Sequence, residues 1–230
     1  HSCYVEKSVL WKHSPFVQTL LLDSDTLLAG APTWLLEIVK NEGVVVTQFS
    51  NWVTTGSIMR SRIEKWRGVH YQAASDGGED ICADELINGL LAAPCVAINT
   101  GVVAWDASHA TARAFLRDWC NLTHEGWRLP ITDEIAAQLL LHKHRDITVV
   151  SDRFNCSPIY GMNKTSAVIW HLHGSKHCLR ADGRGSEGHA IWWPHFQYVW
   201  RENLAGVREW APADDGALAN CLTLQAAGKL

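Results

Sequence analysis

The sequence predicts an α/β sandwich with a largely parallel central sheet. Short apolar runs of strand length alternate with longer segments of helical pattern, and runs such as 44–46 are apolar throughout. Uninterrupted apolar runs are typical of strands that are buried on both faces. The composition agrees with this prediction, because 47% of the 230 residues are apolar, enough to fill the core of one large domain.

The elements follow one another in this order. The run 16–22, bounded by Pro15 and Asp23, predicts the first strand. Pro32 is expected to open a helix that stops at Gly43. Asp106 or Ser108, and later Thr132, are expected to cap two further helices. The remaining expected elements are strands at 44–46, 96–98, 102–105, 147–150 and 167–170, and helices at 58–66, 84–91, 106–122 and 132–143.

The end of the chain differs in composition from the rest. Residues 181–188 form a glycine-rich stretch, 192–210 is rich in aromatic residues with a helical pattern, and 211–230 is typical of a loosely held tail. The prediction is therefore a catalytic domain over 1–180, followed by an aromatic-rich extension and tail over 181–230. Its aromatic residues are core in the favoured interpretation, with stacking on acceptor sugars as the alternative.

Charge and hydropathy exclude two classes of function. The net charge is −4, so no basic excess is available to neutralise nucleic-acid phosphates. The sequence contains no run of eighteen apolar residues, so it predicts no membrane span. Seven scattered cysteines without a C-x-x-C pair favour reduced thiols and a cytoplasmic location. Sequons at Asn121, Asn155 and Asn163 leave a secretory lumen open.

Two acidic side chains follow the first predicted strand directly, in Asp23-Ser24-Asp25. Ligands of open α/β sheets gather at the carboxyl ends of strands, and two carboxylates there can hold a divalent cation. The alternative is a simple turn that caps a helix.

A histidine-rich segment, His171-Leu-His-Gly-Ser-Lys-His177, follows the last predicted strand. Imidazole suits Mn²⁺ or another transition ion better than Ca²⁺. Gly174 lets a backbone amide approach a phosphate, and Lys176 supplies a positive charge. The alternatives are a cluster of structural or solvent-exposed histidines, or a zinc site made from histidines.

Two further motifs lie between these. Asn99-Thr100-Gly101 interrupts a strand-like stretch, where glycine marks a bulge or the close approach of another group, and asparagine suits sugar hydroxyls. Asp133 and Glu134 fall in the first turn of a predicted helix, where acidic residues commonly serve only the helix dipole.

Together and in this order, the motifs resemble nucleotide-sugar glycosyltransferases of the GT-A type, a Rossmann-like three-layer fold. The resemblance is greatest to the retaining glycogenin-like enzymes and the bacterial lipopolysaccharide galactosyltransferases. Their pattern is Asp-x-Asp after a strand, Asn-x-Gly-Val on a strand, Asp-Gln opening a helix, and a late His-x-x-Gly followed by Lys. The match runs from Lys7 to Cys178.

The resemblance implies a role for each matching residue. The implied ligands of a Mn²⁺ or Mg²⁺ ion on the donor diphosphate are Asp23, Asp25 and His171. Gly174 and Lys176 would contact the donor phosphates, and His177 is a second candidate because the interval from His171 to Lys176 is one residue shorter than usual. Lys7, sixteen residues before Asp23, stands near the position where the family carries a basic residue that reaches the donor.

The same resemblance places the donor sugar. Asn99 and Gly101 would lie against it, and Asp133 would bind its hydroxyl groups. Glu134 replaces the family's glutamine on the face opposite the leaving group, where a carboxylate shields an oxocarbenium-like centre or acts as a nucleophile. Only 22 residues precede Asp23, so the chain is expected to lack the N-terminal βα units that form much of the nucleotide base pocket.

The expected function is metal-dependent transfer of a sugar from a nucleotide donor, with UDP as the default, to a saccharide or other hydroxyl acceptor, with retention. Two other classes stay open. One is a metal-dependent enzyme acting on phosphate esters, such as a nucleotidyltransferase. The other is a non-catalytic remnant that binds sugars or a partner.

Overall fold

The computed structural model describes residues 3–53, 57–73, 78–93, 95–157 and 163–172. Three of the predicted donor-binding residues, Gly174, Lys176 and His177, lie outside these ranges, as do the predicted domain boundary near residue 180 and the aromatic-rich extension. No helix in the described ranges is long and apolar enough to span a membrane.

The central sheet has four strands in the order β1-β6-β3-β7. They are β1 (Gln18–Leu22), β3 (Val44–Val53), β6 (Cys95–Asp106) and β7 (Thr148–Val150). β6 is antiparallel to both of its neighbours, whereas β3 and β7 are parallel. Three strands therefore point in one direction and β6 in the other. Three of the four strands thus share one direction, as predicted, but β3 with β7 is the one parallel pair in this sheet. The sequence does not reveal this difference, because the apolar pattern of a strand buried on both faces is the same in either direction.

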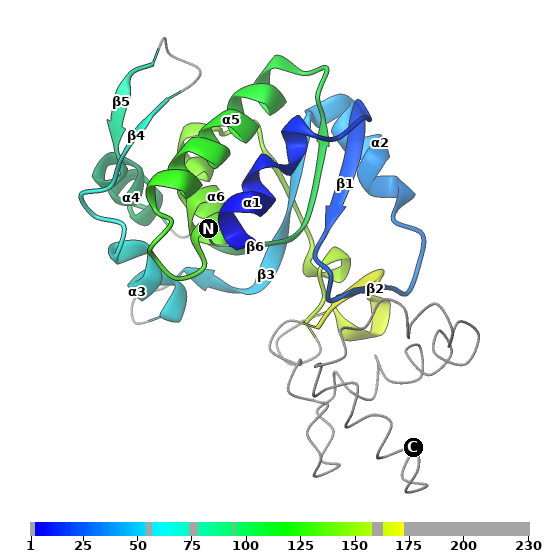
Figure 1. Ribbon diagram of the computed structural model, residues 1–230. Coiled ribbons are helices and arrows are strands. Elements are labelled where there is room, and N and C mark those ends of the chain that lie inside the picture. Colours follow the sequence, from blue (N-terminus) through cyan, green and yellow to red (C-terminus); the bar gives the residue numbers. More distant parts are fainter. Residues whose placement is uncertain (1–2, 54–56, 74–77, 94, 158–162, 173–230) are drawn as a thin grey trace, which may run out of the picture.

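Helices cover both faces of this sheet, which confirms the predicted α/β sandwich (Figure 1). α2 (Thr33–Glu42) packs on one face, where Leu35 and Val39 meet Val45, Val102 and Ala104. The opposite face carries the larger core, which includes residues of α4 (Ala83–Leu91), α5 (Ala110–Glu125) and α6 (Thr132–Lys143). Alternate residues of β3 and β6 enter the two cores, as the period of two in a strand requires.

Four smaller elements complete the main body. α1 (Cys3–Val9) packs against α5 and α6, α3 (Ile58–Glu64) contacts α6, and β4 (His70–Gln72) pairs with β5 (Asp80–Cys82). The sequence did not predict α1. Short 3-10 turns occupy Leu10–Lys12, Asp152–Phe154 and Lys164–Ser166.

The predicted irregularity at 99–101 is confirmed as a bulge: β6 stays extended there, but Val46 pairs with Val103 and Thr47 with Asn99, so residues 100–102 have no pairing partner on β3. A second register shift lies between Gln48 and Trp52. Two local predictions were wrong. His109, and neither Asp106 nor Ser108, precedes α5, because the Asp106 carboxylate instead accepts hydrogen bonds from the amide and hydroxyl of Ser108. Thr132 is the first residue of α6 rather than its cap.

A small ribbon brings the late histidine to the end of β1. β2 (Thr26–Leu28) follows the acidic turn and pairs with β8 (Ile169–His171), with Thr26 opposite His171. His171 is therefore the last residue of β8 rather than the start of a loop. The Asp25 carbonyl accepts a hydrogen bond of 2.8 Å from the Leu172 amide, which fixes the two segments together.

Candidate functional site

The acidic turn is anchored to the sheet through its main chain. The Asp23 amide donates to the Gly101 carbonyl at 2.8 Å, and the amide and hydroxyl of Thr26 both donate to the Asp23 carbonyl. The segment is thus a turn, as the simpler interpretation of the sequence has it. The turn is made by backbone groups and the Thr26 hydroxyl, so these bonds do not involve the carboxylates of Asp23 and Asp25.

Those carboxylates converge on His171. The Nε2 atom of His171 lies 3.3 Å from Asp25 Oδ1 and 3.6 Å from Asp23 Oδ2. One ligand atom from each of the three residues lies within 4.8 Å of the others. The His171 side chain is 4% exposed, and those of Asp25 and Asp23 are 17% and 29% exposed. The cluster is therefore buried on the histidine side and open on the carboxylate side.

The donor set fits a divalent ion. Ligand atoms about 2.1 Å from one ion lie about 3.0–3.5 Å from each other in octahedral or tetrahedral arrangements, close to the two distances from Nε2. Two carboxylates with one imidazole match the mixed oxygen and nitrogen preference of Mn²⁺, and Mg²⁺ would use the carboxylates. An open side lets phosphate oxygens or water complete the coordination.

Gly101 makes room for the histidine ring. A Cβ atom at this position would lie 2.2 Å from His171 Cε1, 2.3 Å from its Nδ1 and 2.8 Å from Asn99 Oδ1. Gly101 is not one of the positive-φ glycines, which among the described residues are Gly43, Gly68 and Gly78. The site thus requires glycine here for space and not for backbone conformation, which agrees with the predicted close approach at this strand position.

Lys7 connects the acidic turn to the start of α6. Its Nζ lies 2.7 Å from Asp23 Oδ1, 3.0 Å from Asp133 Oδ2 and 3.3 Å from Thr100 Oγ1, so each of its three donor positions has an acceptor. Burial lowers the pKa of Lys7, but the carboxylates of Asp133 and Asp23 more than offset this, and the pKa is raised overall. The lysine is therefore a permanent positive charge within an acidic site.

Asp133 and Glu134 are buried, whereas residues that only interact with the helix dipole can remain exposed to solvent. Asp133 is 2% exposed and Glu134 6% exposed. Thr100 Oγ1 donates to Asp133 Oδ2 at 2.7 Å, and Asn99 Nδ2 donates to Glu134 Oε2 at 2.5 Å. Asp133 Oδ1 is buried without a hydrogen-bond partner among the described residues.

The environment of Glu134 favours its protonated form. Burial, followed by the negative charge of Asp133, raises the pKa of Glu134 to about 7, against the smaller opposing effects of Arg62, Asn99 and Lys7. The carboxyl group is therefore divided between its acid and its anion near neutral pH. Such a pKa is typical of carboxyl groups with a chemical role, although buried structural acids share it.

A strained turn presents this acidic pair. Ile131, which precedes α6, has φ 54° and ψ 53°, and it is the one non-glycine residue with positive φ in the described ranges. This left-handed conformation is disfavoured for a β-branched residue. The Trp119 indole holds the turn from the other side by donating to the Asp133 carbonyl at 2.7 Å. Backbone strain is therefore stored beside the acidic pair.

The structure brings together eight of the predicted site residues: Lys7, Asp23, Asp25, Asn99, Gly101, Asp133, Glu134 and His171. The other three lie outside the described residues. Sequence reasoning missed Thr100, which contacts Lys7 and Asp133, and Asn155, whose Oδ1 lies 2.8 Å from His171 Nδ1. Asn155 was visible only as a sequon. Its side chain is buried, so a glycan there is incompatible with the fold.

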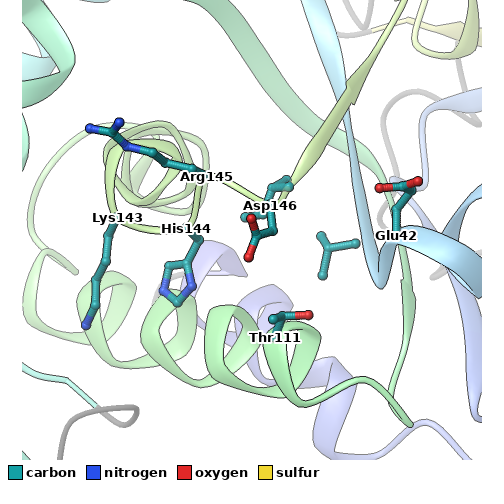
Figure 2. A pocket seen from close by; sticks show the side chains of 8 residues that line it. Glu42, Thr111, Lys143, His144, Arg145 and Asp146 are labelled. Carbon is teal, nitrogen blue, oxygen red and sulfur yellow. The ribbon is translucent and has the colours of Figure 1, made fainter.

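A cavity lies at the opposite edge of the sheet from the acidic turn, at the amino ends of β3 and β7. It has a volume of about 230 Å³ and is lined in part by Glu42, Thr111 and Asp146. In Figure 2, Lys143 and Arg145 extend away from Asp146 and Glu42. Lys143 and His144 both bind Asp118, at 3.1 and 2.8 Å. The side chains of Lys143 and His144 thus serve the buried Asp118, and the edge that carries the acidic turn is the better candidate.

Comparison with protein-family models and with curated proteins finds no match. The solved structures that resemble this fold are glycosyltransferases. The bifunctional glycosyltransferase WbbM, in its apo form, matches at 12% identity and a TM-score of 0.46, over 79% of this chain and 33% of that one. The galactosyltransferase LgtC in complex with donor and acceptor sugar analogues matches at 12% identity and a TM-score of 0.47, over 81% of this chain and 63% of its own.

An active-site mutant of LgtC also matches at 12% identity and a TM-score of 0.47, over 86% of this chain and 70% of its own. This chain thus spans about a third of WbbM and about two thirds of LgtC. What the site does must therefore be argued from the side chains of this chain.

Proposed function

We propose that this protein is a metal-dependent glycosyltransferase that moves a sugar from a nucleoside diphosphate donor, with UDP as the nucleotide, to a hydroxyl group of a saccharide or other acceptor. The observation that carries the proposal is the convergence of Asp23, Asp25 and His171 at the carboxyl end of β1. A metal site beside a lysine and two buried acids is suited to a donor that carries both a diphosphate and a sugar.

The diphosphate side of the site consists of the metal ligands and Lys7. Asp23, Asp25 and His171 would hold Mn²⁺ or Mg²⁺, which when bound neutralises the negative charge that develops on a departing diphosphate. Lys7 offsets the repulsion between the carboxylates of Asp23 and Asp133, because it pairs with both and its pKa is raised. No strong acid is needed to protonate such a leaving group, unlike in glycoside hydrolysis.

The sugar side consists of Asn99, Asp133 and Glu134. Asp133 Oδ1 is an acceptor that no described residue satisfies, as a group that binds a sugar hydroxyl would be. The amide of Asn99 is already committed to Glu134, so a contact between Asn99 and the sugar would also set the position of that carboxyl group.

Glu134 would act on the face of the sugar opposite the diphosphate, with retention of configuration. It would either shield an oxocarbenium-like centre or form a transient covalent intermediate. Either role needs the anion. With a pKa of about 7, the active fraction of Glu134 rises through neutral pH. The transfer rate should therefore rise between about pH 6 and pH 8 and then level off.

The first experiment is calorimetric titration of UDP in the presence and absence of Mn²⁺. We expect Mn²⁺-dependent binding that is lost in Asp25→Asn, because the substitution removes one carboxylate ligand. Asp80→Asn is the control, since Asp80 is exposed and its carboxylate pairs with His70 away from the site. Strong Mn²⁺-dependent UDP binding by Asp25→Asn would show that the metal assignment is wrong.

The second experiment identifies the reaction. UDP-linked hexoses are incubated with the protein and simple saccharide acceptors, and the products are analysed by ³¹P and ¹H NMR. Release of UDP with a product of unchanged anomeric configuration supports retaining glycosyl transfer. Release of UMP or pyrophosphate would point instead to another class of phosphate-ester chemistry. Binding without turnover would favour the non-catalytic alternative.

A further inference from the structure

Asn155 lies at the centre of a buried hydrogen-bond network between the sugar side of the site and His171. It follows the turn Asp152–Phe154 and is 1% exposed. Its Nδ2 lies 2.7 Å from Thr47 Oγ1, 2.9 Å from Asn99 Oδ1 and 3.2 Å from the Asn99 carbonyl oxygen. Its Oδ1 lies 2.8 Å from His171 Nδ1.

The backbone positions Asn155 beside the histidine. The Cys156 amide donates to the Ile169 carbonyl at 2.8 Å, and the His171 amide donates to the Cys156 carbonyl at 3.0 Å. The segment that carries Asn155 therefore lies along β8 as an additional short bridge. This geometry depends on main-chain bonds and is independent of the two side chains that it brings together.

The orientation of the Asn155 amide follows from its neighbours. The Asn99 carbonyl oxygen can only accept a hydrogen bond, so the end of the amide that faces it must be the NH₂ group. The Asn155 oxygen consequently faces His171 Nδ1, and an oxygen there requires Nδ1 to carry a proton. In the neutral imidazole, Nε2 then presents its lone pair to Asp23 and Asp25.

The lone pair of Nε2 and the oxygens of the two carboxylates are all electron-pair donors, and together they favour a cation in the space between them. The distances of 3.3 and 3.6 Å from Nε2 to the two aspartates leave the position where a metal ion would bind as the natural place for this cation. The tautomer that Asn155 imposes is thus the one that metal ligation requires, since a nitrogen that carries a proton cannot bind a metal.

The network continues to the acidic pair. The Gly101 amide donates to Asn99 Oδ1 at 2.8 Å, and because an amide N–H can only donate, the Asn99 NH₂ group faces Glu134. Asn99 Oδ1 accepts a second hydrogen bond from Asn155. A chain of side-chain hydrogen bonds therefore runs from Glu134 through Asn99 and Asn155 to His171, with its polarity fixed by two backbone groups.

We propose that Asn155 is a positioning residue, which holds His171 in the tautomer and orientation that metal binding needs and connects this ring to Asn99 on the sugar side. The inference rests on the proposed function for the metal, but the tautomer of His171 in the metal-free protein is independent of it. Asn155 acts through His171 and Asn99 and has no contact with the donor in this role.

The test uses two substitutions with different consequences. Asn155→Leu has a similar volume and removes both the acceptor for His171 and the donor to Asn99. Asn155→Asp keeps an oxygen that accepts from His171 Nδ1 but loses the donor. Asn121→Leu is the control, because Asn121 is an asparagine on α5 whose side chain bonds only to the Gln72 carbonyl within the described part of the chain.

Two measurements are made on each protein. Long-range ¹H–¹⁵N NMR of the metal-free protein at a pH of about 8.5, where histidine side chains are generally neutral, reports the tautomer of His171. The signal is assigned by its loss in His171→Gln. Calorimetric titration with Mn²⁺ alone reports the metal affinity, and thermal unfolding checks that each variant is folded.

We expect the Nδ1–H tautomer in the wild type, in Asn155→Asp and in the control. Asn155→Leu should give a mixture of tautomers and weaken Mn²⁺ binding by about 10- to 100-fold, the usual effect of removing a group that orients a ligand. A wild-type protein with the proton on Nε2 would overturn the inference, and so would a folded Asn155→Leu variant with unchanged Mn²⁺ affinity.

The wild-type tautomer decides the matter even if neither Asn155 variant folds. A wild type that shows the Nδ1–H tautomer but binds no Mn²⁺ would refute the proposed function and leave the assignment of the tautomer to Asn155 standing. The two proposals can therefore fail separately.

Discussion

The close packing of the His171 ring against Gly101 can be tested by adding a single methyl group at position 101. Gly101→Ala adds a Cβ atom 2.2 Å from His171 Cε1, in a strand whose backbone accepts alanine. Ordinary contact begins at 3.4 Å, so the ring must move by more than about 1 Å. His171 is 3% exposed and bonded to Asn155, so any turn of the ring disturbs buried packing and this hydrogen bond.

Two consequences of this displacement have calculable sizes. Overpacking a buried site costs about 1–3 kcal/mol, and loss of the bond from His171 to Asn155 adds about 1 kcal/mol, so we expect a loss of about 2–4 kcal/mol of unfolding free energy. Moving Nε2 away from Asp23 and Asp25 removes one of three ligands. We expect Mn²⁺ affinity to fall by at least about tenfold, as when the orientation of a ligand is lost.

Urea unfolding and calorimetric titration with Mn²⁺ measure these two effects. Gly89→Ala is the matched control, because its Cβ would also collide with a histidine ring, 2.0 Å from His142 Nε2, but in α4 and away from the site. His142 is only partly buried and can move, so metal binding should be unchanged. If Gly101→Ala keeps both its stability and its Mn²⁺ affinity, the packing of His171 against β6 is not what assembles the site.

Three further predictions concern the acidic half of the site. Relative to Glu134→Gln, the wild type should lose up to about 3 kcal/mol of unfolding free energy as pH rises from 4.5 to about 7, because Glu134 keeps its proton over this interval only in the folded state. Urea unfolding at several pH values measures this loss, and equal pH profiles for the two proteins would contradict the raised pKa of Glu134. Lys7→Met should cost about 3–5 kcal/mol because it leaves the buried Asp133 without its cation, and a thermal shift below about 2 °C would argue against that pairing. Ile131→Asn should raise the unfolding free energy by about 1 kcal/mol because asparagine tolerates the left-handed conformation, and a less stable variant would show that the turn is not strained.

The residues proposed as metal ligands could be found from the sequence because they mark the ends of strands. Asp23 and Asp25 directly follow β1, and His171 ends β8, so the local pattern that predicts each strand also indicates where its last side chains lie. Gly101 was recognisable for a related reason, since a glycine within an apolar strand is unfavourable unless something approaches it closely. In each case a pattern in neighbouring residues indicates where a side chain meets a distant part of the chain.

The remaining residues could not be found in this way. Asn155 is separated from Asn99 by 56 positions, and nothing near it in the sequence distinguishes a network residue from a sequon or a turn. Lys7 lies on α1, which local patterns did not predict, and its place in the site came from the resemblance alone. Strand direction was equally hidden, because β6 is buried on both faces and its apolar pattern carries no sign of being antiparallel.

Two separate connections join the proposed metal side of the site to the proposed sugar side, and both depend on β6. Lys7 joins Asp23 to Asp133 by ion pairs and donates a third hydrogen bond to Thr100 Oγ1. Asn155 joins His171 to Asn99, and Asn99 in turn bonds to Glu134. Thr100 and Asn99 are consecutive in β6, and both side chains bond to the first turn of α6, Thr100 to Asp133 and Asn99 to Glu134. The same strand therefore takes part in both connections, one through a charge and the other through neutral amides. Substitutions in either connection should consequently change metal binding and the acidic pair together, as expected for residues that share one network.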